Sequence, residues 1–242
     1  MSNRQITGSI AFAGLVLLLG CGGSGGQARA QTPPKADSGV FLLNIRGQIT
    51  GTDTFTITAD GGSRATLVLS INGRKVSATN TIKAVRGRMT EVVTEAQPGG
   101  KFTLTLQGGK GKFQVAGNPA LNREISVPLR LFPTGNFMPH LLAYALANYD
   151  ARKGGAQTFD FLLVDNGGQT HGALTRGRSQ PLTIKGKPVT ITHYALNIQG
   201  SQGPVSADLI TDSQRRLLYF HVPSQDYRSA RDGYQELAAA SK

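Results

Sequence analysis

Short segments in which apolar and polar residues alternate, separated by glycine-rich turns, fill most of this chain and constrain its fold more than any other feature. Residues 54–58 and 101–106 alternate with a period of two, which marks a strand with one buried face. Asn72-Gly73 separates two such segments and is the strongest short-range hairpin signal, because both positions tolerate positive φ. With 31 glycines and no tryptophan, the composition is typical of a β-rich protein with many turns.

One segment, at residues 136–150, has helical periodicity instead. Its apolar residues recur every three or four positions and form a single apolar face. They are Met138, Leu141, Leu142, Ala145, Leu146 and Tyr149. Asn136 is the expected N-cap, and Pro139 lies in the first turn, where proline is tolerated. A second, terminal helix is expected within residues 227–240.

The order of these segments is strands, one helix, then strands again, without the alternation of a parallel α/β fold. The sequence therefore predicts a mainly β protein. Its sheet should be antiparallel and strongly curved, or an open barrel, with one central amphipathic helix against one face.

The start of the chain has the anatomy of an exported protein. Arg4 precedes the apolar run 10–19, and small Gly20 stands directly before Cys21, the only cysteine. The run is short for a membrane span and is typical of a signal peptide. Residues 21–39 are rich in Gly, Ser and Pro, a composition that predicts a flexible tether. We therefore expect a signal peptide at 1–20, a tether at 21–39 and a β-rich domain at 40–242.

Leu18-Leu19-Gly20-Cys21 resembles the lipobox of bacterial lipoproteins. The resemblance implies that the Cys21 thiol receives a diacylglycerol, that cleavage follows Gly20, and that fatty acyl chains such as palmitate then anchor the protein in the cell envelope. An ordinary signal peptide would instead leave Cys21 as an odd free thiol. Gly22 is not acidic, so the resemblance implies the outer membrane, facing the periplasm, if the cell has two membranes.

The charge balance is strongly basic, with 26 Lys and Arg against 14 Asp and Glu. Nucleic acid is excluded as a partner by the exported address and by the scarcity of exposed aromatic residues among the basic ones. Acyl lipid or an anionic envelope polymer is the expected partner, besides the membrane that holds the lipid anchor. A solvated basic surface is an equally simple interpretation. The candidate anionic-ligand patch comprises Arg74, Lys75, Lys83, Arg86 and Arg88.

The last third of the chain has a second resemblance. Residues 194–198, 208–212 and 216–225, followed by the Arg-containing segment 227–231, look like a recurrent module of exported bacterial β-rich domains of unknown function. In that module a final hairpin leaves through a Val-Pro pair, here Val222-Pro223. Some such domains precede a hydrolase domain in longer chains, but the module itself carries no catalytic residues.

No motif in the sequence assembles catalytic chemistry, a metal site or a cofactor site. His140, His171, His193 and His221 do not pair at metal-ligand spacing. We therefore expect no metal or cofactor and no catalytic residue. His193 and His221 fall on segments that could be neighbouring strands, so an enzyme would draw on them and on Asp208.

Three functions remain open at this stage. The first is a membrane-anchored envelope lipoprotein, not an enzyme, whose domain binds a partner or acts as a scaffold. The second is a carrier of lipid or lipoprotein, in which a half-barrel encloses an apolar cavity and the helix at 136–150 is its lid. The third is an envelope hydrolase. A purely structural role for the helix, as a plug of the core, competes with the second.

Overall fold

The computed structural model describes residues 31–46, 49–71, 73–200 and 203–240. Fifteen strands form one sheet in which every neighbouring pair is antiparallel except β9 with β10. Cys21 and the predicted signal peptide lie outside the described residues. No helix among the described residues is long and apolar enough to span a membrane.

The first half of the sheet is a meander of hairpins. It comprises β1 (Asp37–Ile45), β2 (Ile49–Ile57), β3 (Ser63–Ile71), β4 (Arg74–Val85), β5 (Arg88–Gln97), β6 (Lys101–Gln107), β7 (Lys110–Val115) and β8 (Arg123–Ser126), with a 3-10 turn, η1 (Pro119–Leu121), before β8. Ile71 pairs with Arg74, which confirms the two-residue hairpin predicted at Asn72-Gly73.

The second half returns along the other side of β1. It comprises β9 (Phe132–Thr134), β10 (Ala156–Leu163), β11 (Gln169–Ile184), β12 (Lys187–Gly200), β13 (Gly203–Asp212), β14 (Leu217–Val222) and β15 (Tyr227–Arg231), with a 3-10 turn, η3 (Pro223–Gln225), and a short helix, α2 (Leu237–Ala240). The two halves join where β1 pairs with β15, so β8 and β9 form the two edges of the sheet.

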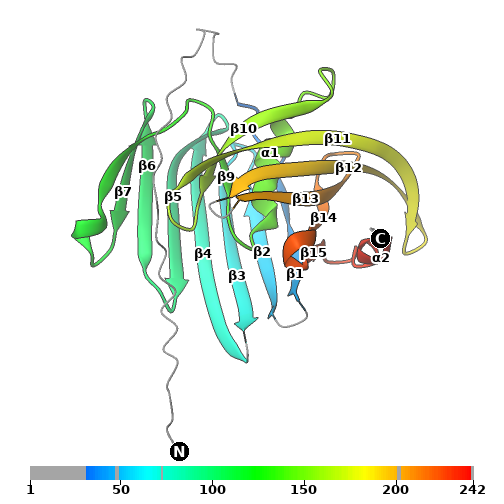
Figure 1. Ribbon diagram of the computed structural model, residues 1–242, viewed down its shortest axis with the longest axis horizontal. Helices are drawn as coiled ribbons and strands as arrows, with labels where there is room; N and C mark the ends of the chain where they lie inside the picture. The colour runs from blue at the N-terminus through cyan, green and yellow to red at the C-terminus, as the bar shows by residue number, and fades with distance from the viewer. Residues whose placement is uncertain (1–30, 47–48, 72, 201–202, 241–242) are drawn as a thin grey trace, which may run out of the picture.

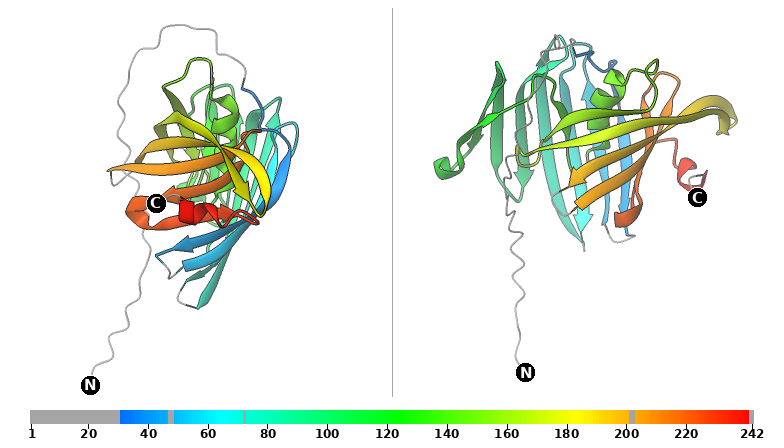
Figure 2. Two further views of the ribbon diagram at one scale, coloured as in Figure 1. Left: turned by 90° about the vertical axis from the view of Figure 1, so that its right-hand side faces the viewer. Right: turned by 45° about the horizontal axis from the view of Figure 1, so that its top comes forward.

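The sheet curls so strongly that its second half lies across its first (Figures 1 and 2). Its inner face encloses the main apolar core, to which both halves contribute. A chain of buried hydrogen bonds also crosses the interior: Asn80 donates to the Thr94 hydroxyl, which donates to the Val164 carbonyl. The predicted mainly β, curved antiparallel fold is thus confirmed.

The edge strand β8 is joined to the other half by side chains. Arg123 donates to the Asn166 carbonyl, and Gln169 donates to the Ser126 carbonyl. Phe113 packs so closely on Gly167 that a Cβ at that glycine would lie 2.6 Å from the ring. These contacts therefore hold the two halves of the sheet together, although its edge strands β8 and β9 do not pair.

A helical plug fills the curled sheet. It consists of a 3-10 turn, η2 (Pro139–Leu142), that continues into α1 (Ala143–Asn148). Every residue of η2 is buried, as are Tyr144, Ala145 and Leu146 of α1. The plug is thus surrounded by the sheet on more than the single face that the sequence predicted (Figure 1).

The helix is shorter than the predicted range 136–150. Phe137 has left-handed backbone (φ 63°), which is incompatible with a helix that begins before it. Asn136 is not the N-cap, because Met138 occupies that position, and the Asn136 N–H donates to Asp165. At the other end Tyr149 is already extended.

Two further boundaries differ from the sequence prediction. Residues 227–240 are not one helix: β15 occupies 227–231, and α2 covers only the last four described residues. The domain also begins before residue 40, because Gln31 is buried and β1 starts at Asp37. The side-chain amide of Asn148 holds both the N–H and the carbonyl of Thr32, so this part of the predicted tether belongs to the folded domain.

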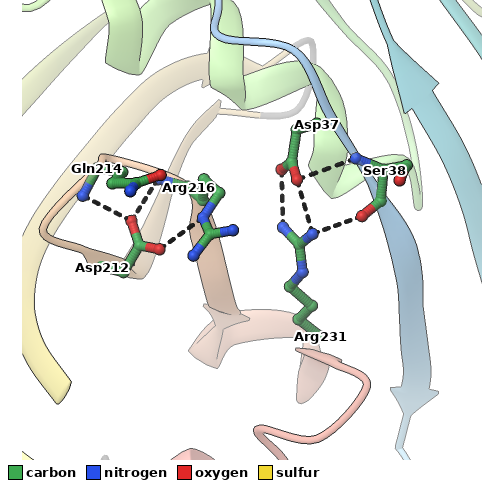
Figure 3. A network of polar contacts seen from close by, with 6 residues as sticks. All are labelled: Asp37, Ser38, Asp212, Gln214, Arg216 and Arg231. Atoms are coloured by element: carbon green, nitrogen blue, oxygen red, sulfur yellow. Dashed lines mark hydrogen bonds and ion pairs between the residues drawn. The ribbon is translucent and has the colours of Figure 1, made fainter. Parts of the chain in front are cut away.

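Arg231 fastens the first strand to the last (Figure 3). Its guanidinium makes two 2.7 Å hydrogen bonds to the Asp37 carboxylate and a third to the Ser38 carbonyl. The Arg231 and Asp37 side chains are both only 12 % exposed. Glycine at position 39 leaves room for this contact, since a Cβ there would lie 3.0 Å from the guanidinium.

Replacing Arg231 should therefore weaken the whole sheet. We expect Arg231→Met to lower the free energy of unfolding by about 3 kcal/mol, because it leaves the Asp37 carboxylate largely buried and unpaired. Lys83→Met is the matched control: it breaks the exposed Lys83–Glu91 pair and should cost less than about 1 kcal/mol. Chemical denaturation of both variants measures the difference. Equal losses of unfolding free energy in the two variants would contradict the proposed role of the Arg231–Asp37 contact.

Candidate functional site

The most unusual group in the interior is a buried pair formed by Asp53 and His140. Asp53 is a central residue of β2 on its inner face, and His140 belongs to η2 of the plug. Asp53 Oδ2 lies 2.6 Å from His140 Nδ1, and both side chains are 0 % exposed. Phe55, two residues along β2, stacks on the imidazole with 5.2 Å between ring centroids. The pair therefore joins the plug to the inner face of β2.

Each member of the pair keeps one polar atom without a partner. Among the described residues, nothing hydrogen-bonds to Asp53 Oδ1 or to His140 Nε2. Buried polar atoms are nearly always satisfied by protein or by ordered water. Asp53 Oδ1 and His140 Nε2 are thus two buried polar atoms that no described residue satisfies.

Tyr227 and Ser229 of β15 add two further hydroxyls to this region. Both are buried, and neither has a hydrogen-bond partner among the residues that the structure describes. Burial raises the pKa of Tyr227 well above its ordinary value, the Asp53 charge raises it further, and the neighbouring Ser229 hydroxyl opposes the shift. Tyr227 thus remains a neutral phenol that can donate a hydrogen bond.

An apolar cavity of about 60 Å³ lies between the plug and the inner face of β12–β15. The plug side includes Phe137, Met138 and Leu142, and the sheet side includes Leu196 and Ala207. The Tyr227 ring lines this cavity and packs edge-on against Phe137 and Phe220. A volume of this size holds about two water molecules or a few carbon atoms.

Polar contacts hold the plug at its ends. The Asn136 N–H donates to Asp165 Oδ2 at 2.6 Å, and burial raises the pKa of Asp165 to about 6, against the lowering effect of that hydrogen bond. Arg215 donates to the Tyr149 carbonyl at 2.9 Å, beyond the C-terminus of α1. In the middle, the Tyr144 hydroxyl donates to the Gly61 carbonyl. The plug is thus fixed to both halves of the sheet.

Within the described part of the chain, the Asp53–His140 pair lacks a third group that would complete a nucleophilic site. A carboxylate on Nδ1 orients a histidine as in hydrolytic triads, and the opposite nitrogen must then activate a hydroxyl or thiol. No described side chain bonds to Nε2. No group of three or more His, Cys, Asp or Glu side chains within the described part of the chain could hold a metal ion.

The basic residues predicted to form one patch do not come together. Arg74 and Lys75 begin β4, whereas Lys83 lies near its end and Arg86 and Arg88 follow in the next turn and strand. β4 has 12 residues, so the two groups stand at opposite ends of a strand about 40 Å long. Lys83 is also paired with Glu91 at 2.8 Å. The five residues therefore form two groups separated by the length of a strand, and anion binding by them remains a prediction.

His193 and His221, the candidates for an enzymatic site, are not adjacent either. β13 lies between their strands, and His193 pairs with Ile210, two residues beyond Asp208. Asp208 is opposite His221, with Oδ2 3.9 Å from Nδ1, and is 61 % exposed on its side chain. The three residues thus form one weak surface pair and a separate histidine.

Sequence reasoning missed Asp53, His140 and Tyr227. The alternation of Phe55 and Ile57 extends back to Asp53 and places it on the buried face of β2. An acidic residue at a core-facing position was the available signal. His140 gave none, because its partner Asp53 lies 87 positions away in the sequence, and no local pattern marked Tyr227.

Comparison with known protein families and with curated protein sequences found no significant match. Among solved structures, the chain is similar to a beta-barrel-like protein of the domain of unknown function DUF1849 from Brucella abortus. That likeness has a TM-score of 0.52 and 8 % identity, over 84 % of this chain and 97 % of the other. It supports the fold.

Two further structures are more distant. One is the hypothetical lipoprotein YmcC from Escherichia coli (TM-score 0.34, 11 % identity, 85 % of this chain and 89 % of the other). The second is a putative exported protein with a YmcC-like fold from Bacteroides fragilis (TM-score 0.29, 10 % identity, 84 % of this chain and 98 % of the other).

The buried pair should behave as a unit when its members are replaced. We expect His140→Phe to lower the free energy of unfolding by about 3 kcal/mol or more, because it strands the Asp53 carboxylate in the core. Adding Asp53→Leu should recover most of that loss, since a buried pair is often replaceable by apolar side chains. A double-mutant cycle by urea denaturation measures the coupling, and additive losses would contradict it.

Proposed function

We propose that this chain is a lipid-anchored protein of the bacterial cell envelope, acylated at Cys21 after cleavage behind Gly20. The lipobox-like residues 18–21 support the proposal, and so does the position of the folded domain, which begins ten residues beyond Cys21. A lipoprotein carries two or three acyl chains, and such an anchor holds a protein firmly to a membrane. In a cell with two membranes, the proposed site is the outer membrane, facing the periplasm.

The proposed role of the β-rich domain is non-catalytic: it acts as a binding or scaffold module. The observation that carries this proposal is that the plug occupies the interior of the curled sheet. All of η2 and half of α1 are buried there, and the apolar cavity beside the plug measures about 60 Å³. Drug-sized ligands need several hundred Å³. A large substrate therefore has no room in this cavity, and we assign recognition to the outer surfaces and rims of the sheet.

A lipid carrier is the second candidate, and the apolar lining of the cavity favours it. An acyl chain would have to displace the plug from between β12–β15 and the opposite half of the sheet. Native mass spectrometry of protein purified from cells tests this idea. A carrier should retain acyl ligand, and Ala207→Leu, which fills the cavity, should abolish retention, whereas the exposed Lys75→Leu should not. Repeated recovery of empty wild-type protein would exclude the carrier.

Replacement of the lipidation residue tests the anchor. Cells supplied with an alkyne fatty acid should label the wild-type protein and not Cys21→Ser, because the serine hydroxyl does not accept the diacylglycerol. The variant should leave the membrane fraction or persist as an uncleaved precursor. Ser24→Ala, three residues away in the tether, should label normally. Wild-type protein that takes no label and remains in the soluble fraction would contradict the proposed lipid anchor.

The non-catalytic role has its own test. Purified wild-type protein should show no turnover on broad ester and glycoside panels. Robust turnover that a single substitution such as His221→Ala removes, with the melting temperature unchanged, would overturn the proposal in favour of an envelope hydrolase.

A further inference from the structure

The start of the described chain is bound to one rim of the sheet. Gln31 is buried and donates to the Leu131 carbonyl, and Thr32 is held by both polar atoms of the Asn148 side chain. Pro33 packs over Gly87, where a Cβ would lie 2.8 Å from the proline nitrogen. The chain that leads back towards Cys21 therefore departs from a fixed point on this rim.

The rim is formed by every second turn of the meander. Because the strands are antiparallel, the turns between β2 and β3, β4 and β5, and β6 and β7 lie at the same end of the sheet (Figure 1). The Gly87 N–H donates to the Asp60 carbonyl, which joins the first two turns, and the Val127 N–H donates to the Gly109 carbonyl, which joins the segment after β8 to the third. Arg88 and Gly109 line one depression, which connects the second turn with the third. The rim is thus one connected surface around the exit of the tether.

Two of the large apolar side chains that the described residues expose are found on this rim. Val85 is 61 % exposed and Leu129 is 58 % exposed. Val85 pairs with Arg88, and Arg88 and Leu129 line the same shallow depression as Gln31. Arg86 and Arg88 are exposed beside them. Exposed aliphatic side chains beside cations suit the boundary between water and anionic lipid headgroups.

The tether length decides which end of the domain can reach a membrane. The ten residues from Cys21 to Gln31 span at most about 35 Å when fully extended. The opposite end of the sheet, with Arg74 and Lys75, lies about 40 Å further along β4. Even a tether stretched fully back along the sheet would be shorter than this distance. The rim at Gln31 is held near the membrane by its own attachment.

We propose that this tether rim, comprising Val85, Arg86, Arg88 and Leu129, docks on the surface of the membrane that holds the lipid anchor, with Arg86 and Arg88 against anionic phospholipid headgroups. This inference rests on the proposed lipidation of Cys21. Docking orients the curled sheet with its β3–β4 turn pointing away from the membrane. The anchor holds the protein at the membrane, and the contact of the rim with the headgroups then gives the domain one defined orientation.

Fluorophore depth tests the orientation in the full lipidated protein. The acylated sulfur of Cys21 is a thioether and does not react, so Val85→Cys on the rim and Lys75→Cys at the far end can each be labelled with NBD. The protein is reconstituted in vesicles of phosphatidylcholine, with or without phosphatidylglycerol. The label at 85 should shift to the blue and be quenched by lipid-borne nitroxide when phosphatidylglycerol is present. The label at 75 should remain in water.

Charge reversal provides the matched pair. In protein labelled at position 85, Arg86→Glu with Arg88→Glu should abolish the lipid signal. The control, Arg74→Glu with Lys75→Glu, changes the net charge by the same amount at the far end and should preserve that signal. One basic residue near an anionic surface strengthens association by about fivefold. Loss of both should lower the equilibrium constant for docking of the rim by about 25-fold or more.

The outcomes separate this inference from the proposed function. Protein that does not float with vesicles of phosphatidylcholine lacks the anchor, which overturns both. Protein that floats, but whose rim label stays in water on phosphatidylglycerol vesicles, retains the anchor and overturns the docking alone. Equal depth for the two labels, or no effect of reversing Arg86 and Arg88, overturns it too.

Discussion

The pairing of β1 with β15 is the interaction on which the remaining architecture depends. Each half of the chain is a local meander, and only this ladder joins the halves into one sheet. Five residue pairs form the ladder, and the Arg231–Asp37 contact fastens one end of it across 194 positions of sequence. An arginine in a largely buried bidentate pair is specific in its geometry as well as attractive. With the junction in place, the twist of the long sheet brings its second half over its first and creates the interior that the plug fills.

The interior combines apolar packing with a small number of polar groups whose partners come from distant segments. Asp53 from the first half meets His140 from the plug, and Thr94 from the first half meets the Val164 carbonyl from the second. A buried polar atom without its partner costs more than the bond contributes when it is made. These contacts therefore select one relative position of the two halves and the plug, in a cavity wall that is otherwise mostly apolar.

Much of the fold followed from local pattern, because strand alternation and turn residues are local properties. The hairpin at Asn72-Gly73, the antiparallel plan and the existence of a single central helical segment were all predictable. β15 was not, because Tyr227-Arg228-Ser229-Ala230-Arg231 has little apolar alternation, and its inward-facing Arg231 is acceptable only beside Asp37. The candidate site could not be predicted either, because it also depends on a distant partner: Asp53 and His140 are 87 positions apart. The position of Thr32 on the folded domain could not be predicted, because it depends on a hydrogen bond to Asn148, 116 positions away.

The position of β15 also sets the order in which the chain can fold. β1 has β2 as a neighbour early, but its other edge stays unpaired until nearly the whole chain is available, and contacts of such long sequence separation form slowly. The sheet therefore cannot close on a nascent chain that still lacks its C-terminal strand. For a protein proposed to be exported to the cell envelope, this delay is an advantage, because the sheet closes only after its last strand is available.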